Sequence, residues 1–365
     1  MDPFYIFSGN KKNSNKRSIK KSSSFNNPVI FINGFNGSGK TLISPIVASL
    51  PKVELMTFMY PIEWASSMLY SNNMSPEGYR EFIKMVVDES IYNQQMSRSV
   101  NFRPSDLSSV FRSTKKLDYF KRLFNAGDDH VVPIIKNNKP ISCFTTCHLL
   151  PLFPSIANAF KSRLLFLETV RDPLLMYEQL SILGNNILDT HSEKDFTFRA
   201  VDQDISRTYL DFYSNKEVFL DEENLTHEEN LINYIERFFD FYFNTDFAEN
   251  LFDSRLIFIP FEEFVTNPNK WIDIVSSHLN VKINKETIKE MARQKVPRKL
   301  LSQGLKLPIY KKYGAKSIAA SSLAEERNRL IQKTRNDFED PNQFSRLISI
   351  SEKYIDWKQS FLQKI

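Results

Sequence analysis

Apolar residues in this chain alternate between short continuous runs and segments with helical spacing. The short runs, rich in β-branched and aromatic residues, predict buried strands at 28–33, 53–58, 140–146, 163–170 and 255–260. Helical spacing predicts helices at 42–50, 76–97, 116–138 (in two pieces, broken near Gly127), 152–161, 231–250 and 269–279. The helix at 152–161 links two strands in a βαβ arrangement, which favours parallel pairing. We therefore predict an α/β fold of three layers around a central, mainly parallel sheet, with helical additions.

The two ends of the chain differ from this pattern. Residues 1–26 are rich in Ser, Asn and Lys, and they hold six basic residues against Asp2, which accounts for the whole formal charge of +5. We predict a disordered basic tail there. The rest divides into a domain at 27–320, with an irregular insertion at 184–230, and a helical extension at 321–365. Because the body is neutral overall, nucleic-acid binding is not expected.

Targeting signals and metal-binding patterns are not evident in the sequence. No apolar run approaches the length of a membrane span, and the basic tail is not followed by an apolar segment of signal-peptide type. The two cysteines, Cys143 and Cys147, do not form a disulfide framework, and we expect reduced thiols in a cytoplasmic protein. The five histidines are scattered without zinc-ligand spacing, so no metal site is predicted.

The segment GFNGSGKT, residues 34–41, carries the clearest chemical signal. It fits the phosphate-binding pattern G-x-x-x-x-G-K-[ST], with a predicted strand before it and a predicted helix after it. Glycines allow the backbone N–H groups to point inward, and the helix N-terminus adds partial positive charge. We predict that the phosphate-binding residues are Gly34, Asn36, Gly37, Ser38, Gly39, Lys40 and Thr41.

Four segments, taken together, resemble the sulfotransferase family, whose members use this loop for 3′-phosphoadenosine 5′-phosphosulfate. They are the loop itself, residues 146–149 (TCHL), residues 167–173 (LETVRDP), and residues 256–264 (LIFIPFEEF) with Asn267-Pro268. Their order and spacing over roughly residues 28–315 are similar to those of the family. The resemblance implies sulfuryl transfer from the phosphosulfate donor to an acceptor hydroxyl, on a small molecule or a carbohydrate.

The resemblance also implies roles for individual residues. Arg171, at the end of a strand, would clamp the 3′-phosphate, and Gln179 stands where the family usually has a serine. Arg298 and Lys299 are similar to a late phosphate contact. His148 would be the catalytic base. Lys40 would replace the mid-loop cation of the family, because that position is Gly37 here.

Two other functions stay open at this point. Lys40 and Thr41 also fit an ATP-dependent kinase or NTPase with Mg²⁺. Such an enzyme needs a carboxylate at the end of a neighbouring strand, and the nearest candidates are Glu168, inside a predicted strand, and Asp172, after Arg171. The second alternative is a nucleotide-binding protein without catalytic activity. The sequence does not indicate an oligomeric state.

Overall fold

A five-stranded sheet forms the centre of the molecule in the computed structural model, which describes residues 19–125, 127–183, 208–210, 217–219, 226–244, 253–306 and 317–364. All its strands are parallel, in the order β2 (Thr57–Phe58), β3 (Ser142–Thr145), β1 (Val29–Gly34), β4 (Leu164–Val170) and β7 (Leu256–Pro260). The predicted α/β class with a parallel sheet is confirmed. The strands predicted as a βαβ pair, β3 and β4, lie on either side of β1, where Ile30 is in register with Cys143 and Leu165.

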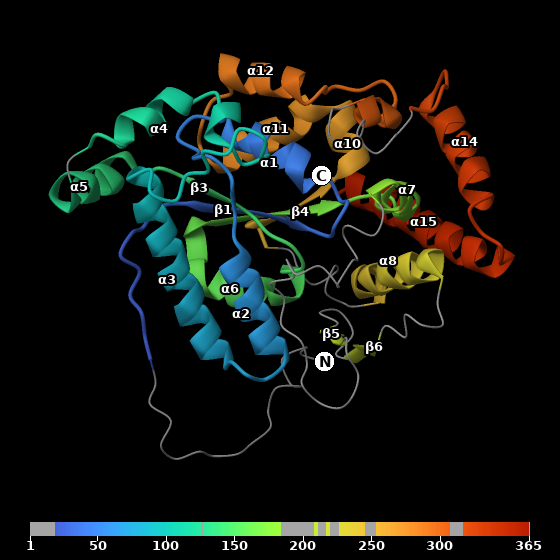
Figure 1. The fold of residues 1–365 in the computed structure, drawn as a ribbon, viewed down its shortest axis with the longest axis horizontal. Coiled ribbons are helices and arrows are strands. Elements are labelled where there is room, and N and C mark those ends of the chain that lie inside the picture. Colours follow the sequence, from blue (N-terminus) through green and yellow to red (C-terminus); the bar gives the residue numbers. More distant parts are fainter. Residues whose placement is uncertain are drawn as a thin grey trace.

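Helices cover both faces of the sheet (Figure 1). Side chains of β1 alternate between two cores, with Val29 and Phe31 in one and Ile30 and Ile32 in the other, as the period of a strand requires. One core is completed by α2 (Tyr60–Tyr70), α3 (Pro76–Gln95), α6 (Phe153–Phe160), α7 (Pro173–Leu183) and α8 (His227–Asn244). The other is completed by α1 (Lys40–Ala48), α10 (Phe261–Thr266), α11 (Pro268–His278) and α12 (Lys285–Arg293).

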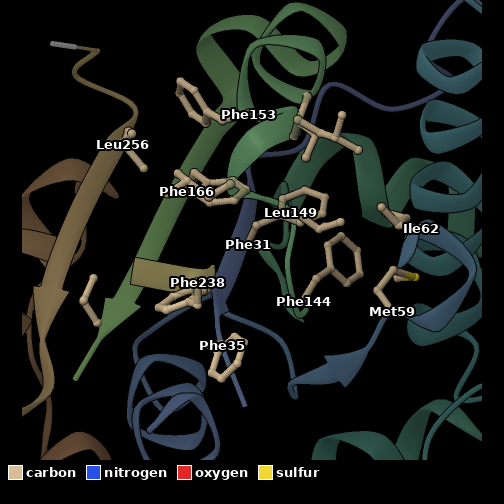
Figure 2. Close-up of a cluster of buried hydrophobic side chains, with 14 of the residues drawn as sticks. Phe31, Phe35, Met59, Ile62, Phe144, Leu149, Phe153, Phe166, Phe238 and Leu256 are labelled. Carbon is tan, nitrogen blue, oxygen red and sulfur yellow. The ribbon is translucent and has the colours of Figure 1, made fainter. Parts of the chain in front are cut away.

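Aromatic side chains dominate the first core (Figure 2). The ring of Phe31 lies 5.5 Å from that of Phe144 and 6.2 Å from that of Phe166, so the three central strands contact through phenyl rings. On α8, Phe238 is buried with its ring centre 4.3 Å from that of Phe35. The prediction that the aromatic helix packs into the core is confirmed for Phe238 and its buried neighbour Phe239.

The second predicted strand, residues 53–58, is shorter in the structure than the sequence predicts. Of the predicted strand 53–58, only Thr57 and Phe58 pair with β3, and Val53 forms an isolated bridge to Ile141. Glu54 still donates its N–H to the carbonyl oxygen of Ile141, but both backbone groups of Leu55 bond to side chains instead, its N–H to Tyr119 and its carbonyl oxygen to Gln94. The short strand is followed by α2, a helix that the sequence pattern did not predict.

The helices predicted at 42–50 and 116–138 are present in the structure. The predicted break near Gly127 separates α4 (Lys116–Arg122) from α5 (Asp128–Asn138), and the predicted helix at 42–50 is α1, with Pro45 inside it. Single turns lie at 110–112, 150–152, 161–163 and 301–306. Part of the predicted insertion forms a separate antiparallel pair, β5 (Thr208–Leu210) with β6 (Glu217–Phe219), and residues 184–207, 211–216 and 220–225 lie outside the described residues.

Of the tail predicted to be disordered, residues 1–18 lie outside the described residues. The part that follows contacts α3, where Lys21 pairs with Asp88 at 2.9 Å, and Phe25 is buried. Within the described chain, no helix combines the length and the apolar character that crossing a membrane would need.

The C-terminal extension forms α14 (Leu323–Arg335) and α15 (Pro341–Leu362), which pack on the body. Their contacts with the turn after β4 are polar and buried. Tyr354 donates a 2.6 Å hydrogen bond to Glu262, whose other carboxylate oxygen accepts the N–H of Asp172. Arg327 pairs with the Asp172 carboxylate, and Ser351 donates to it. These bonds fix the backbone of the turn that begins at Arg171.

Candidate functional site

The predicted phosphate-binding loop lies at the centre of the carboxyl edge of the sheet. β1 is the middle strand, and the chain continues from it to β2 and β3 on one side and to β4 and β7 on the other. Open α/β sheets bind ligands where the strand order reverses in this way, because the loops on the two sides separate and leave a crevice. The loop runs from Gly34 to Gly39, and α1 begins at Lys40.

Two glycines of the loop are required by close contacts. Gly34 has a φ of +147°, and a Cβ there would lie 2.5 Å from the carbonyl oxygen of Thr169. Gly39 precedes α1 with a φ of +104°, and a Cβ would lie 2.2 Å from the ring of Phe261. Only glycine fits both the left-handed backbone and the space. The loop is therefore held tightly against β4 and α10.

We expect Gly39→Ala to distort the loop. The new Cβ must displace Phe261 or the backbone, so we expect the protein to lose about 1–3 kcal/mol of stability and its affinity for phosphate ligands to fall at least tenfold. Urea unfolding and calorimetric titration measure the two effects. Gly127→Ala is the matched control, because a Cβ there meets nothing within 4 Å. Equal effects of the two substitutions would contradict the role of Gly39.

Lys40 contacts its own loop. Its ammonium donates to the carbonyl oxygens of Gly34 at 2.8 Å and Phe35 at 2.7 Å, and the side chain is buried. The charge therefore lies on the side of the loop that faces His148 and Cys147: burial raises the pKa of Cys147 to about 11, and the Lys40 ammonium opposes that shift. Ser38 is also turned inward, 2.7 Å from the hydroxyl of Thr169. Asn36 donates to the hydroxyl of Tyr234, and its side-chain oxygen faces the thiol of Cys147 at 3.5 Å.

Arg171 follows β4 and reaches back to the loop. Its guanidinium donates to the carbonyl oxygen of Gly37 at 2.9 Å and also to the side-chain oxygen of Gln179, in the second turn of α7. It lies over the ring of Phe261, 4.4 Å from the ring centre. Asp172 caps α7, accepting a hydrogen bond from the N–H of Leu174.

Arg298 approaches the same aromatic ring from another segment. Its guanidinium is 5.9 Å from the centre of Phe261, and it donates to the carbonyl oxygen of Lys295. Gly304 leaves the room for it, because a Cβ at Gly304 would lie 2.3 Å from the guanidinium. Two buried arginines thus meet at one ring, next to the start of α1. The attraction between them and an anion would be strong, because both are shielded from water.

These groups line one cavity of about 1200 Å³, which we call the main cavity. Five of the predicted donor-binding residues belong to its wall: Gly39, Thr41, Arg171, Gln179 and Arg298. The wall carries further cations that the sequence reasoning did not single out, namely Arg112, Arg293, Lys295, Lys306, Arg327 and Lys358. Lys299 does not line it: its side chain is exposed, and its N–H bonds to Gln303.

His148 lies on the other side of the loop, after the end of β3, in a left-handed conformation with a φ of +60°. Its ring meets the edge of Phe35, with ring centres 5.2 Å apart. Burial, assisted by the nearby Lys40 ammonium, lowers the pKa of His148 to about 3. The imidazole is therefore neutral at physiological pH, but a group with so low a pKa accepts a proton weakly.

Glu63 is a functional candidate that the sequence analysis missed. It lies on α2, and its carboxylate accepts the N–H of Cys147 at 2.7 Å, directly beside His148. Burial raises the pKa of Glu63 to about 7, although the Cys147 N–H and Lys40 oppose the shift. A carboxylate with a pKa near 7 is well matched to proton abstraction at neutral pH. Pro61, at the start of α2 after a short strand, is typical of a helix start, so the sequence marked the helix but not Glu63 itself.

The strand ends beside the loop bear on the kinase alternative. β3, the neighbour of β1, ends in Thr145 and Thr146, whose hydroxyls donate to Ser44 and Asn33. The carboxylate of Glu168 is fully buried within β4, where it accepts a hydrogen bond from Asn33. The described end of β3 thus offers hydroxyl groups already bonded within the protein, rather than the carboxylate that a Mg²⁺–ATP site uses. No group of three His, Cys, Asp or Glu side chains able to hold a metal occurs in the described part of the chain.

No family model matches the sequence, and no curated protein is similar to it. Solved structures with a similar fold are sulfotransferases. The sulfotransferase domain of the Synechococcus PCC 7002 olefin synthase is 9% identical, with a TM-score of 0.37 over 89% of this chain and 100% of that domain. A sulfotransferase domain from the curacin biosynthetic pathway is 11% identical, with a TM-score of 0.37 over 86% and 99%. A sulfotransferase from Mycobacterium avium is 11% identical, with a TM-score of 0.34 over 86% and 77%.

Proposed function

We propose that this protein is a sulfotransferase-like enzyme that transfers a sulfuryl group from 3′-phosphoadenosine 5′-phosphosulfate to an acceptor hydroxyl. The observation that carries the proposal is the pairing of Arg171 and Arg298 over Phe261, in the cavity that also exposes the start of α1. The helix start favours one anionic group, and the arginine pair favours a second. A donor with phosphates at its 3′ and 5′ positions supplies both.

The residues present fit this donor. The backbone of the loop and the N-terminus of α1, where Thr41 lines the cavity, would hold the 5′-phosphosulfate. Arg171 and Arg298 would hold the 3′-phosphate, and Gln179 orients Arg171. The main cavity, at about 1200 Å³, exceeds the size of common small-molecule pockets, so a nucleotide fits within it.

The chemistry needs one proton acceptor. The acceptor oxygen forms a bond to sulfur, the bond from sulfur to the 5′-phosphate oxygen breaks, and the hydroxyl proton passes to a base. Glu63 suits that role because its pKa is about 7 and because its carboxylate, which accepts the N–H of Cys147, lies at the end of β3 beside the loop. Lys40, in the same region, would offset negative charge that develops during transfer. His148 remains the alternative base.

Calorimetric titration of the full chain tests the donor assignment. We expect 3′-phosphoadenosine 5′-phosphate to bind with a Kd in the micromolar range, and ATP with Mg²⁺ to bind at least tenfold more weakly, because it lacks the 3′-phosphate. Removal of Mg²⁺ with a chelator should leave the first titration unchanged. Tighter binding of ATP with Mg²⁺, lost on chelation, would contradict the proposal in favour of a kinase. Binding of neither ligand would contradict a nucleotide site altogether.

A further inference from the structure

Three aromatic rings form a stack at the start of α2. The rings of Phe58 and Tyr60 are 6.0 Å apart with planes 15° apart, and those of Tyr60 and Trp64 are 6.2 Å apart with planes 19° apart. Tyr60 is 52% exposed and Trp64 is 37% exposed. Near-parallel rings that follow one another in this way present a broad apolar surface to solvent. We name Phe58, Tyr60 and Trp64 the aromatic stack.

Phe58 packs against the second core, but Tyr60 and Trp64 do not serve the core. The buried residues of α2 are Ile62, Ala65, Ser66 and Leu69, which follow the helical period on one face. Tyr60 and Trp64 are four positions apart on the opposite face, together with Glu63. Large aromatic side chains on the solvent side of an amphipathic helix contribute little to folding. Their position therefore points to contact with a ligand.

The aromatic stack is continuous with the reaction site. Tyr60 is close enough to Glu63 and Cys147 for both to raise its pKa, after the larger effect of burial. Glu63 accepts the N–H of Cys147, and the thiol of Cys147 lies 3.5 Å from the side-chain oxygen of Asn36 in the loop. A ligand on the rings would therefore have its nearest hydroxyl groups beside the candidate base.

A recess of about 490 Å³ adjoins the same rings, and we name it the side recess. Phe58 and Tyr60 form part of its wall, and Ser105 and Leu107 separate it from the main cavity, since they line both. Most other wall residues are neutral and polar: Thr57, Gln94, Ser99, Asn101 and Ser108. Asp106 is the only charged side chain among the described residues of the wall. An anionic ligand would find no countercharge there.

Gln94 adds an unused acceptor to this wall. Its side chain is 4% exposed, and its amide N–H donates to the carbonyl oxygen of Leu55 at 2.7 Å. No donor within the described residues reaches its side-chain oxygen. A buried oxygen without a donor is unfavourable, because it has lost its hydrogen bonds to water. A hydroxyl group of a ligand in the side recess would supply the missing donor.

We infer that the acceptor is a neutral carbohydrate, bound with a sugar ring on the aromatic stack and its hydroxyls in the side recess. The inference rests on the proposed function, because it names the substrate class of the same reaction. A sugar combines an apolar ring face, which packs on aromatic rings, with many hydroxyls that match the polar wall. A lipid would leave the polar wall unsatisfied, and a phenol would supply a single hydroxyl.

Binding is tested first without donor. Maltohexaose, cellohexaose and chitohexaose are titrated into the full chain, and intrinsic tryptophan fluorescence is followed, because Trp64 is exposed whereas Trp271 is buried. We expect a saturable change with at least one oligosaccharide. Calorimetry should show at least tenfold weaker binding for Tyr60→Ala and for Trp64→Ala, and near-normal binding for Tyr60→Phe, which keeps the ring. Phe124→Ala removes an aromatic that is 88% exposed outside the stack, and it should bind normally.

Transfer is tested next, with the phosphosulfate donor and the oligosaccharide that binds. We expect a sulfated sugar, and a rate at least tenfold lower for Trp64→Ala. Binding of 3′-phosphoadenosine 5′-phosphate without binding of any oligosaccharide overturns the inference and leaves the proposed function standing. Sulfation of 2-naphthol or a long-chain alcohol in place of the sugars would likewise overturn the inference and leave the proposed function standing. Sugar binding that depends on Trp64, in a protein that does not bind the nucleotide, supports the carbohydrate surface and overturns sulfuryl transfer.

Discussion

Arg171→Ala should weaken binding of 3′-phosphoadenosine 5′-phosphate by about 100-fold. The guanidinium is buried against Phe261, so its hydrogen bonds to a phosphate would be shielded from water, and each charge-assisted bond contributes about 1.5–3 kcal/mol. Arg171→Lys should recover only part of the loss, because an ammonium cannot reproduce the planar fork. Isothermal titration calorimetry measures the affinity of the wild type, Arg171→Ala and Arg171→Lys for this nucleotide.

Lys299→Ala is the matched control for charge. Lys299 is a nearby cation that is exposed and does not line the main cavity, so its removal should change the affinity less than twofold. Circular dichroism and a thermal melt establish that Arg171→Ala folds, since this arginine also bonds Gly37. Gln179→Ala provides a second variant, with a smaller expected loss. Unchanged affinity in folded Arg171→Ala would rule out the clamp on the 3′-phosphate.

Glu63→Gln should lower kcat by a factor of about 10²–10⁴ while leaving nucleotide affinity unchanged. The amide keeps the size and can still accept the N–H of Cys147, but it cannot take a proton. The rate of the wild type should increase as the pH rises through about 7, because Glu63 must be ionised to act as a base. Glu63→Gln should lose this dependence. The measurement is the pH profile of kcat/KM between pH 5 and 9.

His148→Ala separates the two candidate bases. Because the pKa of His148 is about 3, its protonation does not change above pH 5, and the increase near pH 7 should persist in this variant. A loss of 100-fold in His148→Ala, with normal kcat in Glu63→Gln, would assign the base to His148.

The pH dependence of protein stability offers a further check on the raised pKa of Glu63. The pKa of Glu63 is raised in the folded state, so its contribution to stability is present at low pH and is lost as the pH rises through about 7. Glu63→Gln should therefore be more stable than the wild type at pH 8.

The local sequence determined most of the sheet and the loop. Residues 34–41 stand between an apolar run and a helical pattern, and these patterns depend on near neighbours, so β1 and α1 could be predicted. The same holds for Arg171, since Asp172-Pro173 marks a helix start after a strand. The second strand could not be predicted well. The backbone of Leu55 bonds to Tyr119 of α4 and Gln94 of α3 instead of to β3, and no local pattern reveals those partners.

The tertiary structure alone decided on which side of the loop each chemical group lies. Lys40 and Thr41 are adjacent in sequence, yet Thr41 lines the main cavity whereas Lys40 bonds to the loop on the side of His148. Arg171 and Arg298 are 127 positions apart, and they meet only because Phe261 lies between β7 and α10 where both can reach it. Spacing along the chain carries no information about such contacts.

Glu63 shows the same limit for the base. As a single carboxylate in an unassigned segment it carried no signal, and its raised pKa arises from burial and from the place where α2 meets the end of β3. The sequence by itself determined that this protein has an α/β fold with a phosphate-type loop, because strand, turn and helix patterns are local. Which side of that loop binds the donor, and which group stands ready to take a proton, followed from packing between distant segments.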